Sequence, residues 1–287
     1  MEIIVCLKQV PETHNVRIDP TTHALIREGG IINPFDENAL EAALQLKERH
    51  GGKVTVICMG PPDAEKSLRQ TLAMGVDEAV LLTGEAYRRS DTLATSCALA
   101  AAIRKLSAFA KVGQTPSSGA TTDKPGFDLV LCGKQAIDGD TAQVPPGLAE
   151  RLGIPQVTFA ISLEIEVHPE RSGGDGKLRA KRVLDDRYET VEVRLPALVS
   201  VVKQINEPRR PGMKGVLRAK KAPIAIWDAP ELGVDLSQLG GEGSPTAVIK
   251  TFSPARRKRG QMLEGSPEEI AGRFVEVIRG MNFPKPG

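Results

Sequence analysis

The chain has 287 residues, of which 40% are hydrophobic and 3% aromatic, and its formal net charge is +2. This length and composition predict a globular protein made of one large domain, or of one domain with an appendage. So few aromatic residues argue against a stacking surface for single-stranded nucleic acid, and the balanced charge gives no reason to expect nucleic acid or an anionic membrane as a partner.

The four cysteines, Cys6, Cys58, Cys97 and Cys132, lie in apolar surroundings and form no CxxC motif. We predict small buried side chains rather than disulfides or metal ligands. No apolar run is long enough to span a membrane, and the start of the chain lacks a signal-peptide pattern. We therefore expect a cytoplasmic protein without a membrane span.

Strands and helices are predicted to alternate through the first part of the chain. Short apolar runs predict strands at 2–7, 54–59 and 76–82. Helices are predicted from Asn33 to the glycines at 51–52, at 63–74 and at 91–109. Asn33 suits the N-cap and Pro34 the first helical position, and Asp36 could reach back as in a capping box. This alternation predicts an α/β fold, with a parallel sheet wrapped by helices.

The second half of the chain changes period. Residues 112–126 predict a flexible surface loop without chemistry, because they are rich in Gly, Pro, Ser and Thr. Apolar and polar residues then alternate at 162–168, 178–184 and 189–195, which predicts an antiparallel meander, and a buried strand is expected at 196–203.

The loop from Gly133 to Val144 lies between a buried strand at 129–132 and a helix that starts with two prolines. In an open parallel sheet, ligands bind outside the carboxyl ends of the strands, where helix N-termini favour anions. We interpret this loop as the binding site of an anionic nucleotide, with an ordinary capped loop as the alternative. Asp138 and Asp140 would then accept from ribose hydroxyls or cap backbone amides, while Thr141 and Gln143 donate hydrogen bonds without adding charge.

The basic segment 206–221 is either a solvated linker or an exposed docking loop. As a docking loop it would present the apolar tip of Met213, with Arg209, Arg210 and Lys214 steering an acidic partner. Residues 224–287 have little apolar material for a core of their own and end in an amphipathic helix at 268–278, so we expect them to pack on another chain. The Arg/Lys cluster at 256–259 is the weaker candidate for a phosphate or nucleic-acid patch.

The sequence GKQAIDGDTAQV, followed by GIPQVTFA, resembles the signature region of the beta subunit of electron-transfer flavoproteins. The resemblance extends through KQVPET, NPFDENALEAALQLKE, TLAMGVDEAVLL and NEPR…RAKK. It implies a Rossmann-like subunit that pairs with an alpha subunit carrying the redox-active FAD and that exchanges electrons with a flavin dehydrogenase such as an acyl-CoA dehydrogenase. The beta subunit holds AMP or, in electron-bifurcating members, a second FAD whose adenylate part fills the same site. DGDTAQV with KQVPET is closer to the longer bacterial members that hold FAD.

Carried over by motif, the cofactor-binding residues fall at three strand ends and one helix start. They are Cys6, Asn33, Pro34, Phe35, Asp36, Met59, Gly133, Lys134, Gln135, Ala136, Ile137, Asp138, Gly139, Asp140, Thr141, Ala142, Gln143 and Val144. Cys6, Met59 and Gly133 also close three predicted parallel strands on one edge, which agrees independently. Pro145 departs from the family pattern, which usually has glycine at this position. The position of Met213 matches the apolar side chain that the family presents to its dehydrogenase.

The sequence shows no nucleophile–base pair and no metal cluster, and the four histidines fall in loops or at element ends. We therefore expect an electron carrier without catalytic residues, in which the cofactor supplies the chemistry. We expect a nucleotide-binding domain at 1–223, including the docking loop, and a C-terminal arm at 224–287 that packs on the alpha subunit. The alternatives are a stand-alone adenine-nucleotide-binding enzyme using Asp138 and Asp140, and a structural nucleotide-binding subunit. The choice between AMP and FAD, electron bifurcation, the identity of the dehydrogenase and the higher oligomeric state stay open.

Overall fold

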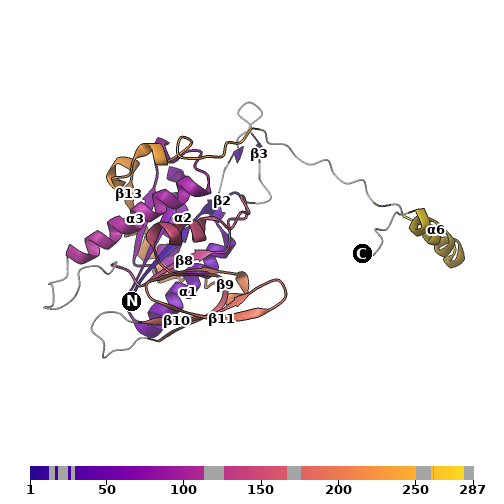
Figure 1. Cartoon of the computed structure of the whole chain (residues 1–287), viewed down its shortest axis with the longest axis horizontal. Helices are drawn as coiled ribbons and strands as arrows, with labels where there is room; N and C mark the ends of the chain where they lie inside the picture. The colour runs from indigo at the N-terminus through magenta and orange to yellow at the C-terminus, as the bar shows by residue number, and fades with distance from the viewer. Residues whose placement is uncertain are drawn as a thin grey trace. The chain divides into compact units, whose positions relative to one another are not determined.

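In the computed structural model, strands and helices alternate through the first 152 residues as the apolar runs predict (Figure 1). The structure describes residues 1–12, 17–18, 25–26, 30–112, 126–166, 176–249, 260 and 262–280. The main elements of this half are β1 (Glu2–Leu7), α1 (Pro34–His50), β6 (Lys53–Met59), α2 (Glu65–Met74), β7 (Glu78–Leu82), α3 (Thr92–Val112), β8 (Leu129–Gly133) and α4 (Val144–Leu152). Two short antiparallel pairs also form, β2 (Gln9–Val10) with β5 (Ile31–Ile32) and β3 (Arg17–Ile18) with β4 (Leu25–Ile26).

Local signals fix several of the helix ends. Asp91 Oδ1 accepts hydrogen bonds from the backbone N–H groups of Leu93 and Ala94 at 2.9 and 3.0 Å, which confirms the expected N-cap of α3. Gly75 and Gly153 follow α2 and α4 with φ of 127° and 68°, a region that favours glycine. The helix expected at 63–74 begins with a 3₁₀ turn at Pro62–Ala64 before α2 starts.

Within the described residues, the long strands form one nine-stranded sheet in the order β11-β10-β9-β12-β8-β1-β6-β7-β13. The strands of the second half are β9 (Gln156–Glu166), β10 (Lys177–Val183), β11 (Tyr188–Arg194), β12 (Ala197–Val201) and β13 (Ala225–Trp227). Neighbours from β12 to β13 are parallel, and so is the first part of β9 against β12. The rest of β9 pairs with β10, and β10 with β11, as the expected antiparallel meander. The meander therefore extends the parallel sheet.

Helices cover both faces of the parallel strands (Figure 1). On one face, Ile3, Val5 and Leu7 of β1 belong to a core cluster with residues of α1 and α2. On the other, Ile4 and Cys6 belong to a second cluster with residues of α3 and α4. Because both faces of β1 are buried, its sequence is a continuous apolar run. All four cysteines are buried and free, as predicted.

The segment expected to be a docking loop is helical in its second half. α5 (Met213–Lys221) follows residues 206–212, which form neither helix nor strand, and packs against α2. Two arginines tie these helices together: Arg69 donates to the carbonyls of Ala219 and Ala222 at 2.7 and 2.9 Å, and Arg218 donates to the carbonyl of Leu72 at 2.9 Å. Each arginine satisfies carbonyls at the end of the opposite helix.

The chain divides into two compact units, residues 1–249 and 250–287. This division differs from the boundary expected at 223/224, because the segment before 249 joins the first unit. β13 pairs with β7 as the last strand of the sheet, and Ala229 and Leu239 are buried in the second core cluster. This segment also contains 3₁₀ turns at Ala229–Leu232 and Leu236–Gln238. In the second unit, α6 (Pro267–Gly280) forms where the amphipathic helix is expected.

Several expectations concern parts of the chain outside the described residues. These are most of the loop expected at 112–126, the turn at 171–175, His14, His23, His168 and the basic cluster at 256–259.

Candidate functional site

Three parallel strands end side by side at one edge of the sheet. Cys6 of β1 is level with Ile57 of β6 and with Cys132 of β8, and Gly133 of β8 is level with Val201 of β12. Met59 is the last residue of β6. The structure thus brings Cys6, Met59 and Gly133 to a common carboxyl edge, as the sequence predicts. Cys6 is buried and Met59 is partly exposed.

Asn33 connects this edge to the loop at 133–144. Its backbone N–H donates to the carbonyl of Lys8 at 3.0 Å, which places the start of α1 beside the end of β1. Its side-chain Nδ2 donates to the carbonyl of Gln135 at 2.8 Å, and its Oδ1 accepts from the N–H of Ile137 at 3.2 Å. Asn33 stands at the N-cap of α1 as expected, but its side chain makes no capping bond to the helix and is hydrogen-bonded to the loop instead.

Asp36 also bridges segments that are distant in sequence. Its two carboxylate oxygens accept from the N–H groups of Lys8 at 2.8 Å and of Gly133 at 3.1 Å, so it joins the ends of β1 and β8. The capping box expected at this position is therefore wrong, because the carboxylate points to the strand ends. Burial raises the pKa of Asp36 to about 7, although the hydrogen bonds from Lys8, Asn33 and Gly133 act in the opposite direction.

The two aspartates of the loop are held by neighbouring side chains. Lys8 Nζ donates to both carboxylate oxygens of Asp138 at 2.7 and 2.9 Å, and the Asp138 side chain is largely buried. Asp140 accepts from the side-chain amide of Gln135. Lys8 was not among the expected site residues. Two sequence signals point to it: its position directly after the predicted first strand, and its place as the first residue of the KQVPET motif.

The backbone of the loop follows a path that few residues adopt. Asp140 and Ala142 both have φ of 55°, in the left-handed region. The N–H groups of Gly139 and Asp140 turn back to the carbonyl of Ala136 at 3.3 and 2.8 Å. A Cβ added at Gly139 would meet no protein atom within 4 Å, so this side of the loop is open. Such conformations concentrate at binding sites, where the surrounding structure fixes them.

The N-terminus of α4 offers fewer donors than the sequence argument assumed. Pro145 and Pro146 occupy its first turn and lack N–H groups, and the N–H of Gly147 donates to the carbonyl of Gln143 at 3.1 Å. Thr92 Oγ1 also donates to Gln143 Oε1 at 3.0 Å. An anion here would therefore be bound mainly by loop amides, by Thr141 and by Lys134, together with the helix dipole.

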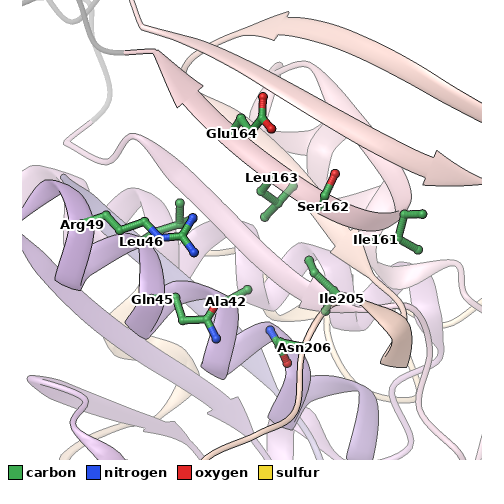
Figure 2. A pocket seen from close by; sticks show the side chains of 10 residues that line it. All are labelled: Ala42, Gln45, Leu46, Arg49, Ile161, Ser162, Leu163, Glu164, Ile205 and Asn206. Carbon is green, nitrogen blue, oxygen red and sulfur yellow. The ribbon is translucent and has the colours of Figure 1, made fainter.

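A separate cleft of about 230 Å³ lies between the second half of α1 and β9 (Figure 2). It is lined by Ala42, Gln45, Leu46, Arg49, Ile161, Ser162, Leu163, Glu164, Ile205 and Asn206. Gln45 is hydrogen-bonded to Glu41 at 2.8 Å, and Asn206 exchanges hydrogen bonds with Asn38. With these amides already paired, we assign no ligand to the cleft.

The four expected docking residues do not behave as one group. Met213 is 77% exposed, and Arg210 and Lys214 are exposed beside it. Arg209 instead forms an ion pair with Glu41 at 2.7 Å and a second one with Glu48, so it anchors residues 206–212 to α1.

The described part of the chain shows no other chemical centre. It contains no group of three or more His, Cys, Asp or Glu side chains that could hold a metal ion. None of the helices described here is long and apolar enough to cross a membrane. The edge site therefore stays the candidate for the anionic nucleotide that the sequence predicts.

Comparison with known proteins identifies one family along most of the chain. The family model described as "Electron transfer flavoprotein domain" matches residues 22–232. Electron transfer flavoprotein subunit beta of Thermoanaerobacterium thermosaccharolyticum is 47% identical over 281 residues, covering 97% of this chain and 98% of the relative. The protein of the same name from Clostridium acetobutylicum is 44% identical over 285 residues, covering 99% and 100%. Caffeyl-CoA reductase-Etf complex subunit CarD of Acetobacterium woodii is 44% identical over 283 residues, covering 97% and 98%.

Proposed function

Because this chain belongs to the electron transfer flavoprotein family, we propose that its carboxyl-edge site binds FAD, with AMP as the alternative occupant of the same adenylate seat. The chain is an electron-carrier subunit of the beta type. FAD, when bound, supplies the electron-transfer chemistry, and the chain's own residues bind and orient it. We propose no catalytic side chain in this subunit.

The observation that carries the proposal is the loop at 133–144, held at the carboxyl edge by two buried side chains. Asn33 fixes the backbone at Gln135 and Ile137, while Asp36 fixes Gly133. This framework leaves one side of the loop open at Gly139, where a diphosphate can approach. The N–H groups of Gly139 and Asp140 are bonded to the Ala136 carbonyl, so the proposed donors are the remaining loop amides and the side chains of Thr141 and Lys134. A backbone that is already held in place binds an anion without a further cost of ordering.

The ion pair between Lys8 and Asp138 argues against the stand-alone enzyme as an alternative. That enzyme would need Asp138 and Asp140 to hold a metal ion that activates a phosphate. Asp138 is instead engaged by the Lys8 ammonium at 2.7 Å, and Asp140 by Gln135. A cation binding there would have to displace both partners.

We propose that the partners are an alpha subunit and a flavin dehydrogenase. α6 supports a partner for the C-terminal arm, because Phe274, Val275, Val277 and Ile278 are 38–54% exposed along it. Met213, exposed at the start of α5, is the proposed contact with the dehydrogenase. Four buried thiols without a disulfide support the expected cytoplasmic location.

The test is to purify the tagged full chain with the subunit that accompanies it, denature the complex and separate the released nucleotides by chromatography. We expect the complex to release more FAD than the one equivalent attributed to the alpha subunit, or to release AMP in place of that additional FAD. A freshly isolated complex that releases no AMP and no FAD beyond that equivalent would refute the proposal. Co-purification of AMP alone would assign the chain to the AMP-holding members.

A further inference from the structure

Phe159 has a backbone conformation that aromatic residues rarely adopt. It lies within β9 with φ of 61°, in the left-handed region. For a bulky residue in a strand this conformation is strained, and it persists only where the surrounding structure fixes it. The outlier therefore needs a physical explanation.

The conformation belongs to a β-bulge at the carboxyl edge. Val199 of β12 is level with Val157, but Val201 is level with Ala160, so Thr158 and Phe159 together face the single residue Ser200. The N–H of Phe159 is satisfied outside the ladder by the buried Ser200 hydroxyl at 3.2 Å. Bulges next to binding sites redirect a side chain, and here the buried hydroxyl stabilises the redirected backbone.

The ring of Phe159 contacts a residue of the proposed cofactor site. Lys134, the residue after Gly133, places its ammonium 5.2 Å from the ring centroid. The N–H of Lys134 donates to the carbonyl of Val201 at 2.8 Å, so the ring and the start of the loop meet at the end of β12. The ring is partly exposed. A second pair, Phe35 under the Lys203 ammonium at 5.2 Å, lies at the same edge.

The order of the strands separates the two ends of a dinucleotide. The proposed adenylate contacts, Cys6 and Met59, are on β1 and β6, on one side of β8. Phe159 is on β9, two strands away on the other side, or about 10 Å at the usual strand spacing. A molecule with its adenylate over β1 and its phosphates over β8 reaches Phe159 only if it continues beyond the diphosphate. AMP ends before that point.

We propose that Phe159 is a specificity residue of the edge site, against which the isoalloxazine ring of FAD stacks. The inference rests on the proposed function, and it concerns the choice of FAD over AMP. The Lys134 ammonium exchanges its contact with the ring for a charge-assisted hydrogen bond to the diphosphate, which is the stronger interaction. The exchange leaves a face of the ring free for the flavin.

The test compares FAD and AMP as probes on the complex of the full chain with its alpha subunit, after removal of the nucleotide at the edge site. Phe159→Leu should raise the Kd of FAD about twofold to tenfold, the usual range for a lost aromatic pair, and leave the Kd of AMP unchanged. Phe159→Tyr keeps the ring and should retain FAD affinity. Phe159→Met is a second variant without a ring, with a flexible side chain that fills irregular space.

Tyr188→Leu is the matched control. It also removes a ring that lies under an ammonium, that of Lys181 at 4.8 Å, but on β11 at the end of the sheet. It should change neither Kd. Equal loss of FAD and AMP affinity in Phe159→Leu and Phe159→Met would overturn the inference, and so would unchanged FAD affinity. Wild-type complex that binds neither probe at the edge site would overturn the proposed function itself.

Discussion

Replacing Gly133 by alanine should break the junction between α1 and the loop. The added Cβ would lie 2.3 Å from Asp36 Oδ1 and 2.6 Å from the backbone carbon of Phe35. Restoring van der Waals contact requires a shift of about 1 Å. The shift would also break the 3.1 Å hydrogen bond from Gly133 N–H to Asp36. Overpacking costs about 1–3 kcal/mol and an unsatisfied buried group about 1–3 kcal/mol more, so we expect a loss of about 2–6 kcal/mol.

The assay is urea denaturation together with the nucleotide content of the purified complex, and Gly133→Ala should lower both the stability and the content. Gly139→Ala is the control in the same loop, since its Cβ meets no protein atom within 4 Å. Its stability should change by less than about 0.5 kcal/mol. If the loop encloses phosphates closely, a larger side chain at Gly139 will weaken nucleotide retention alone. Gly133→Ala protein with unchanged stability and nucleotide content would refute this reasoning.

Three further predictions use other contacts. Asp36→Asn should remove a pH dependence of stability. Burial raises the pKa of Asp36 from 3.8 to about 7, so between these pH values the folded state keeps a proton that the unfolded state has lost, and the stability of the wild type should fall by up to about 4 kcal/mol as pH rises through this range. Denaturation at pH 5 and 8 measures the effect, and an equal change of stability in both proteins would contradict it. Met213→Ala should weaken dehydrogenase docking about tenfold to a hundredfold, the effect of losing about 1.5–3 kcal/mol of burial, with the flavin spectrum unchanged; a mutant that loses flavin would assign α5 to the cofactor site. Gly215→Ala would place a Cβ 2.1 Å from the carbonyl of Ala73, so hydrogen exchange in α5 should accelerate, and unchanged exchange would show that the helices adjust at little cost.

Local signals were sufficient for much of the fold. The strand at Glu2–Leu7, the Asp91 cap and the meander each depend on residues close together in sequence, and the structure has all of them. The common edge of Cys6, Met59 and Gly133 also followed, because parallel strands end on the same side of a sheet. The ends of three strands are therefore enough to predict where the candidate site lies.

Long-range contacts were not predictable from the same signals. The spacing of Asp36 suits a capping box. Its hydrogen-bond partner Gly133 lies 97 residues away, and no local pattern predicts that hydrogen bond. Residues 224–249 show no sustained helical or strand period, so the sequence does not predict that Leu239 is buried in the core. The bulge at Phe159 lies in the pairing of β9 with β12, and the sequence of a single strand does not encode that register.

If a partner docks at Met213 as proposed, the two arginines that join α2 and α5 bear on the thermodynamics of that docking. Arg69 and Arg218 hold α5 in place through backbone carbonyls, so the surface around Met213 exists before any partner arrives. A segment that folds on binding buries its own surface at the same time and gives a large negative heat-capacity change. Docking on a helix that is already formed buries only the contact area. Calorimetry of the complex with its dehydrogenase should then give a small heat-capacity change, and removing Arg69 should make that change more negative.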